Sequence, residues 1–204
     1  MGKFANSLDK LIFSRPRMFE FERFSNEEKE IVEHMVKNYV KANPMLRRYK
    51  YFRTKIIKPK QENFWKFTWE EILMIRNSFK KENMYETFKV VYGISEKDFM
   101  LLEIFNVFSA LKFITDQLEV IRAAEEERLH SELTAEEIEA GAEELQEYDY
   151  YNSLKAMEPD LLKHDEILKL PYSIVFRDMA HTKLVNDIKK NYDGIIARKN
   201  PKPR

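Results

Sequence analysis

The chain contains no cysteine among its 204 residues, which excludes disulfide bonds and thiolate metal sites. Only four glycines are present, too few for a fold built from many tight turns. Apolar residues make up 44% of the chain, enough for a buried core, and charged residues make up 34%. Because Glu, Lys, Leu and Ile are abundant and favour helices, the sequence predicts a mostly α protein.

The chain also lacks an apolar run long enough to cross a membrane, since a spanning helix needs about 20 apolar residues. The nearest approach is residues 99–114, where polar residues recur every three positions, at Glu103, Asn106, Ser109 and Lys112. A single narrow polar stripe is typical of a buried helix. We therefore expect no membrane association and a central helix in this region.

Short motifs of common enzyme classes are missing as well: no Gly-rich phosphate loop, dinucleotide fingerprint, serine-hydrolase elbow or zinc-protease motif occurs. The histidines lie far apart in the sequence, and they are His34, His130, His164 and His181. No second pair of ligands at helical spacing completes a metal site beside His164 and Asp165. Arg177 and Asp178 lie one helical turn before His181, and we interpret this cluster as a polar helix face rather than an acid–base site. We predict a protein that is not an enzyme, with no catalytic residue, no metal site and no cofactor.

The net charge of zero hides an uneven distribution. Residues 1–90 carry a net charge of +8, residues 91–158 carry −12, and residues 159–204 carry +4. Basic ends therefore flank an acidic middle. One interpretation is pairing within the chain or between neighbouring copies, and the other is a basic arm for nucleic acid.

Helix starts are marked by three capping boxes, in which Ser or Thr is followed by Glu three residues later. They are Ser25 with Glu28, Thr68 with Glu71, and Thr134 with Glu137. Ser95 is predicted to open one long central helix that continues to about Leu129. Gly93 is predicted to end the helix before it, and Gly141 to weaken the helix within the acidic segment 123–149.

The stretch HDEILKLPYSIVFRDMAH, residues 164–181, places a proline inside an amphipathic helical pattern. Pro171 has no N–H to donate but suits the first turn of a new helix. We therefore predict that one helix ends and the next begins at Pro171, and we name this junction the proline corner. Asp165 is expected to cap the helix before it. The last helix is expected to end at Asp193–Gly194, before a frayed basic tail, and to carry one apolar side: Ile174, Val175, Met179, Leu184, Val185 and Ile188.

Residues 44–67 have no helix caps, and we predict an extended arm with one short strand at most. Eight basic residues lie between Lys41 and Lys60, with no acid among them. Such cations neutralise phosphates and interleaved rings stack on bases, but the same chemistry suits an acidic protein surface. This chain supplies such a surface in residues 116–149.

Large rings on irregular segments commonly anchor a chain onto a neighbour. The predicted interaction residues combine the arm, the ENFWKF segment and the proline corner: Arg47, Arg48, Tyr49, Lys50, Tyr51, Phe52, Arg53, Lys55, Phe64, Trp65, Pro171 and Tyr172.

The segment YDYYNSLKAMEPDLLKHDEILKLPYSIVF resembles small helical proteins of tailed bacteriophages, including tail assembly chaperones. These share an aromatic–acidic helix, a pattern like D-x-x-[IV]-L-x-[LM]-P-Y, and an amphipathic helix. The matching residues are Asp165, Ile167, Leu168, Leu170, Pro171 and Tyr172. The resemblance covers about 40 of the 204 residues, and the basic arm has no counterpart in it. It implies a non-enzymatic protein that binds other phage proteins during assembly.

We therefore expect a helical bundle around one long central helix, with an extended aromatic–basic arm. The expected parts are residues 1–43, the arm 44–67, the bundle 68–192 and the tail 193–204. The predicted function is that of a bacteriophage virion component or tail-assembly factor, found in the host cytoplasm during assembly and then in the virion. Its partners would be other phage proteins or copies of itself. The alternative is a nucleic-acid-binding accessory protein that uses residues 41–60.

Overall fold

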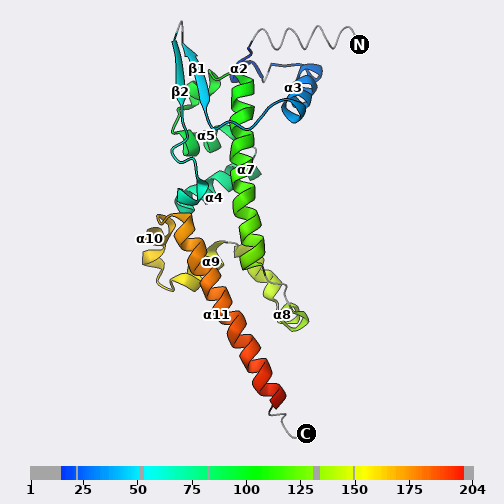
Figure 1. Ribbon diagram of the computed structural model, residues 1–204, viewed down its shortest axis with the longest axis vertical. Helices are drawn as coiled ribbons and strands as arrows, with labels where there is room; N and C mark the ends of the chain where they lie inside the picture. Colours follow the sequence, from blue (N-terminus) through cyan, green and yellow to red (C-terminus); the bar gives the residue numbers. More distant parts are fainter. Residues whose placement is uncertain are drawn as a thin grey trace. The chain divides into compact units, whose positions relative to one another are not determined.

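The computed structural model describes residues 15–21, 23–50, 53–81, 83–130, 134–148 and 150–199. Helices dominate these residues, which confirms the mostly α fold (Figure 1). The chain divides into two compact units. Unit 1 comprises Met1–Phe64 and Glu71–Val120, and unit 2 comprises Trp65–Glu70 and Ile121–Arg204. The predicted N-terminal helix over residues 7–13 lies outside the described residues.

Unit 1 is built mostly from short helices and one hairpin. In chain order its elements are α2 (Met18–Phe21), α3 (Asn26–Asn38), β1 (Leu46–Lys50), β2 (Arg53–Ile57), most of α4 (Trp69–Lys80), α5 (Met84–Tyr92), α6 (Glu96–Met100) and the first part of α7 (Ile104–Leu129).

The helix that was predicted to run unbroken from Ser95 is interrupted between α6 and α7. The N-terminal segment accounts for the break, because its backbone bonds to residues on either side of it. The Met18 N–H donates to the Leu102 carbonyl, and the Ile104 N–H donates to the Pro16 carbonyl, each at 2.9 Å. A segment 84 residues away in sequence thus supplies bonds that a continuous helix would have made internally.

Two local predictions in unit 1 are confirmed. Ser25 and Glu28 form a reciprocal capping box at the start of α3. Gly93 ends α5 in the left-handed conformation, with φ of 66°, which glycine adopts at little cost. The core beneath these helices is fully enclosed and apolar: Val32, Leu46, Phe64, Ile72, Ile75, Phe88, Val91, Leu102, Ile104, Val107, Ala110 and Ile114.

The predicted arm is a two-stranded antiparallel hairpin rather than an extended segment with one strand. β1 and β2 pair in register from Leu46 opposite Ile57 to Lys50 opposite Arg53. Leu46 at its base is completely buried. The Lys60 N–H then donates to the Val91 carbonyl at 2.8 Å, so the base of the hairpin is fixed to α5.

Unit 2 is smaller and surrounds the first half of one long helix. Besides residues 65–70 and the end of α7, its elements are α8 (Ala135–Glu139), the 3₁₀ helix η2 (Ala142–Tyr148), α9 (Tyr150–Met157), the 3₁₀ turn η3 (Leu161–Lys163), α10 (His164–Leu168) and α11 (Tyr172–Lys199). A further 3₁₀ turn, η1 (Phe64–Lys66), crosses the division between the units.

The proline corner is held by backbone bonds to the segment 67–69. The Tyr172 N–H donates to the Phe67 carbonyl at 2.8 Å, and the Trp69 N–H donates to the Leu170 carbonyl at 3.0 Å. Pro171, which has no N–H to contribute, sits between these two bonds and opposite Thr68. The predicted corner is therefore present, with α11 starting at the next residue.

Capping before the corner differs from the prediction. α10 starts at His164 and has no side-chain cap, so Asp165 lies inside the helix's first turn. The side-chain cap in this region is instead Asp160 at the start of η3, where its Oδ1 accepts a hydrogen bond from the Leu162 N–H at 3.1 Å.

Gly141 was predicted to weaken the helix of the acidic segment, and the helix is in fact interrupted there, with Gly141 at φ of 85°. α8 ends before it and η2 follows it. The third capping box is also present: the Thr134 N–H donates to Glu137 at 2.8 Å, and the Glu137 N–H donates to the Thr134 hydroxyl at 3.3 Å.

Candidate functional site

The hairpin concentrates positive charge on a thin element of unit 1. Residues of like charge lie opposite one another across the ladder, with Arg48 facing Lys55 and Lys50 facing Arg53. Like charges directly opposite destabilise a sheet unless an acid relieves them. Asp98 of α6 does so for Arg48, at 2.8 Å. Among the hairpin side chains that the structure describes, those of Arg47 and Lys55 are exposed.

Of the other predicted arm residues, Tyr49, Lys50 and Arg53 lie in the strands, and Tyr51 and Phe52 lie outside the described residues. The hairpin therefore keeps the predicted basic residues together.

The predicted aromatic anchors stabilise the chain's own fold. Phe64 is completely buried in unit 1, with its ring edge-on to Phe113. Trp65 of unit 2 stacks on Tyr172, with 5.7 Å between ring centroids, and contacts Phe176 at 5.0 Å. Tyr172 is buried and its hydroxyl donates to Glu125. Phe64 and Tyr172 are therefore interior, whereas Trp65 and Pro171 are half-buried, and the role of these residues in binding stays a prediction.

The last helix is longer than predicted and has two faces instead of one apolar side. α11 continues through Asp193–Gly194 to Lys199. Its first half packs inside unit 2 through Tyr172, Val175 and Phe176, which are buried. At 3.6 residues per turn the same side of the helix continues through Met179 and Lys183, which are half-buried, to Asn186 and Lys190, which are exposed.

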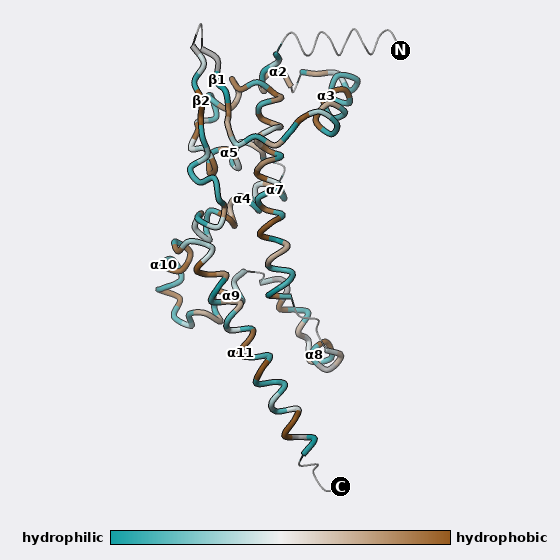
Figure 2. The backbone as a smooth tube through the Cα atoms, viewed as in Figure 1, coloured by the Kyte–Doolittle hydropathy of each residue, from teal (hydrophilic) through white to brown (hydrophobic). Residues whose placement is uncertain are grey.

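The opposite face of α11 carries an apolar stripe that unit 2 leaves uncovered. Leu184, Ile188 and Tyr192 are spaced by four residues and are 57%, 58% and 62% exposed, and Ile195 extends the row. We name Leu184, Ile188, Tyr192 and Ile195 the α11 stripe. Figure 2 shows apolar segments recurring along α11 to its end, and Figure 1 shows this end continuing past α9 and α10.

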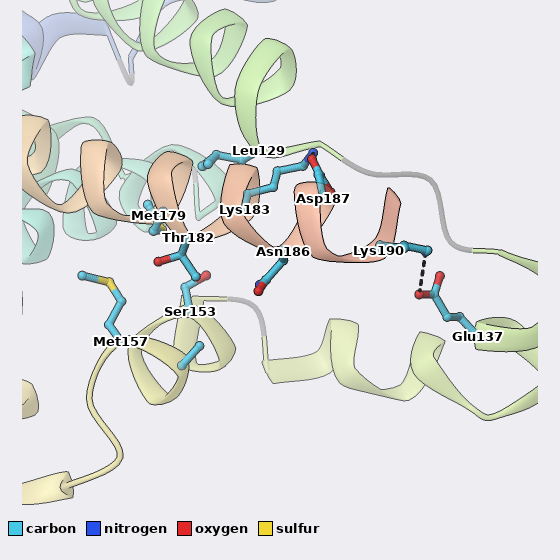
Figure 3. Close-up of a pocket in the computed structure, with 11 residues that line it drawn as sticks. Leu129, Glu137, Ser153, Met157, Met179, Thr182, Lys183, Asn186, Asp187 and Lys190 are labelled. Atoms are coloured by element: carbon cyan, nitrogen blue, oxygen red, sulfur yellow. Dashed lines mark hydrogen bonds and ion pairs between the residues drawn. The ribbon is translucent and has the colours of Figure 1, made fainter. Parts of the chain in front are cut away.

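A pocket of about 420 Å³ lies on the packed side of α11 (Figure 3). Met157 of α9 and Met179 of α11 contribute apolar surface, and its charged groups are paired. Lys183 contacts Asp187 at 2.8 Å, and Lys190 contacts Glu137 of α8 at 3.5 Å. With these charges satisfied, the pocket offers a mixed apolar and neutral polar surface.

Glu137 is held as a carboxylate. The Thr134 backbone N–H and the Lys190 ammonium lower the pKa of Glu137 below its ordinary value of 4.5. The acidic segment is thus joined to the packed face of α11 by an ion pair between exposed side chains.

The histidines stay apart in the fold. His164 is buried, and its Nε2 lies 2.8 Å from the Glu158 carbonyl, while His34 is exposed beside Asn38. Within the described ranges, no three acidic or histidine side chains gather closely enough to hold a metal ion. The helices of that same part of the chain include none that is long and apolar enough to cross a membrane.

Comparisons with protein-family models, with curated proteins and with solved structures found no match.

The α11 stripe is the feature that sequence reasoning missed. Leu184 and Ile188 were assigned to the packed side together with Val175 and Met179, although the two pairs lie on opposite faces. Tyr192 and Ile195 were placed at or beyond the helix end because Asp193–Gly194 reads as a stop. The four-residue spacing of Leu184, Ile188 and Tyr192 was the signal that a second face existed.

Proposed function

We propose that this protein is a non-enzymatic assembly or structural protein that works by docking onto other protein surfaces. The observation that carries the proposal is the α11 stripe, whose apolar residues are exposed on the side of the helix opposite its packed face. Contiguous exposed apolar rows on soluble proteins commonly mark interaction sites.

The setting we propose is tailed-bacteriophage assembly, with a place in the host cytoplasm and then in the virion. Its support is the resemblance of residues 148–176, which include α9, α10 and the proline corner. In this part of unit 2 the resembling motif has a structural use, because Pro171 and Tyr172 fix the start of α11. The motif would thus position the helix that carries the stripe.

The test of this proposal is the native mass of the protein in an extract of the cells that produce it. Replacing Leu184 and Ile188 by Ser should return the protein from a larger complex to its monomer mass. The matched control is Leu162→Ser, because Leu162 is 89% exposed in η3 but lies off the stripe. A wild-type protein that has monomer mass in the extract, or a stripe variant that keeps the wild-type mass, would refute the proposal.

A second candidate function is binding to nucleic acid through the hairpin, favoured by the exposed Arg47 and Lys55. Each neutralised phosphate contributes about −0.9 to the slope of log affinity against log salt. Arg47→Ala with Lys55→Ala should therefore reduce that slope by about 2 units. Arg48→Ala is the control, because Arg48 is engaged by Asp98. Absence of DNA binding by the wild type at low salt eliminates this candidate.

A further inference from the structure

The α11 stripe is flanked by positive charge, which restricts what can cover it. Residues 183–199 contain five basic residues and two acidic ones. Two stripes packed side by side would bring together two segments of net charge +3, which is unfavourable for a symmetric pair. The surface instead fits an apolar row whose surroundings are acidic.

Such a row exists in unit 2. In a 3₁₀ helix, residues three apart lie directly above one another, so Ala142, Leu145 and Tyr148 of η2 form a line. Leu145 and Tyr148 are each 57% exposed. Residues 134–148 contain six glutamates and no basic residue. We name Ala142, Leu145 and Tyr148 the acidic-flanked row.

The row and the stripe also match in length. Ala142 to Tyr148 spans about 12 Å at 2.0 Å per residue, and Leu184 to Ile195 spans about 16 Å at 1.5 Å per residue. A hollow of about 660 Å³ adjoins the Leu184 end of the stripe, with Phe176, Arg128 and Arg177 among its lining residues. Its lining also includes Glu127, and Asp187 paired with Lys183. Phe176 supplies an apolar wall, and Arg128 and Arg177 supply cations, for an aromatic side chain that is flanked by glutamates.

Within its own chain, the acidic segment that carries the row is joined to the other side of α11. Within one copy, the acidic segment contacts α11 through Glu137 and Lys190. Lys190 lies on the side of α11 that continues from Tyr172, and Ile188, two residues away, is about 200° from it around the helix. The ion pair therefore joins the acidic segment to the side of α11 opposite the stripe.

We propose that the α11 stripe of one copy binds the acidic-flanked row of a second copy, with Tyr148 in the hollow beside Leu184. Because the two surfaces differ, a bound pair of copies still presents one free stripe, on one copy, and one free row, on the other. Such a heterologous contact generates rings or open chains of copies. This inference deepens the proposed function by naming the partner of its surface.

The test mixes two full-length variants, each lacking one surface. The stripe variant carries Leu184→Ser and Ile188→Ser, and the row variant carries Leu145→Ser and Tyr148→Ser. Purified wild-type protein should form concentration-dependent multimers by analytical ultracentrifugation. Each variant alone should associate at least about thirtyfold more weakly, as expected for a lost hot spot of about 2 kcal/mol. An equimolar mixture should form a heterodimer and stop there, because only one stripe and one row remain.

Leu162→Ser is again the control and should associate like the wild type, and circular dichroism should show that all variants are folded. A wild-type protein that stays monomeric when purified would overturn the inference. So would a row variant that associates like the wild type, or a mixture that stays monomeric. If the purified protein is monomeric while the cell-extract complex still depends on the stripe, this inference fails and the proposed function stands.

Discussion

Unit 1 and unit 2 use their apolar residues differently. Of the nineteen large apolar side chains that are exposed among the described residues, five belong to unit 1 and fourteen to unit 2. Unit 1 encloses its apolar side chains beneath several short helices and a hairpin base. Unit 2 encloses a small ring cluster around Tyr172 and leaves the opposite face of α11 uncovered. Folding buries most of the large apolar side chains of unit 1, whereas unit 2 retains exposed apolar surface that association with another protein can bury.

The difference also depends on which apolar residues are covered. α5 and α11 both contain Val, Ile or aromatic residues on more than one side. In α5, Thr87, Phe88, Val90, Val91 and Tyr92 are all buried. α11 is 28 residues long, and its second half extends past α9 and α10 (Figure 1). Helix length relative to the surrounding elements therefore determines how much surface remains exposed.

The largest expected effect comes from comparing one core residue of unit 1 with one stripe residue of unit 2. Phe88→Ala should lower the free energy of unfolding by about 3–5 kcal/mol, because Phe88 is completely buried against Phe99. Ile188→Ala should change it by less than about 0.5 kcal/mol at low protein concentration. Chemical denaturation measures both. Equal losses would show that the stripe is packed and would remove the contrast between the units.

A smaller change in the free energy of unfolding, this time an increase, is expected from a substitution of Tyr92 in unit 1. Its hydroxyl is buried and, among the described residues, has no hydrogen-bond partner. Tyr92→Phe should therefore raise the free energy of unfolding by about 1 kcal/mol. Tyr39→Phe, at an exposed site, should leave it unchanged. A destabilised Tyr92→Phe variant would show that the hydroxyl is paired.

Burial also raises the pKa of Tyr92, because the phenolate is poorly solvated there. The unfolded chain releases this proton near the ordinary value of 10.0, whereas the folded chain retains it. The free energy of unfolding should thus fall as pH rises above about 10. The Tyr92→Phe variant should lose less stability over that pH range.

The smallest effect tests whether the acidic segment is ordered in the isolated chain. The pKa of Glu137 should lie below 4.5 in an NMR titration. Since the folded pKa is lowered, the contact stabilises the fold above the unfolded value and is lost as pH falls through the lowered pKa. Lys190→Ala should move the midpoint back up, because it removes the ammonium that lowers the pKa of Glu137. A midpoint in the wild type that equals that of an unfolded peptide would contradict the capped start of α8.

Sequence patterns predicted what depends on neighbouring residues. The Ser25 and Thr134 capping boxes, the Gly93 cap, the weak point at Gly141 and the corner at Pro171 all require only a few adjacent residues and are present. The break between α6 and α7 was not predictable in this way, because it depends on bonds from Pro16 and Met18. The basic hairpin was recognised as a charged segment, but its second strand and the Arg48–Asp98 pair were not.

By itself, the sequence determined the helical character, the uneven charge and the positions of most caps and corners, since these follow from composition and short-range bonding. Only the tertiary structure decided which side of α11 is packed and which rings are interior. A helical pattern shows that apolar residues share a face, but coverage of that face depends on where other elements end. In this protein they end before α11 does, so Leu184 and Ile188 remain exposed while Val175 and Phe176 are buried.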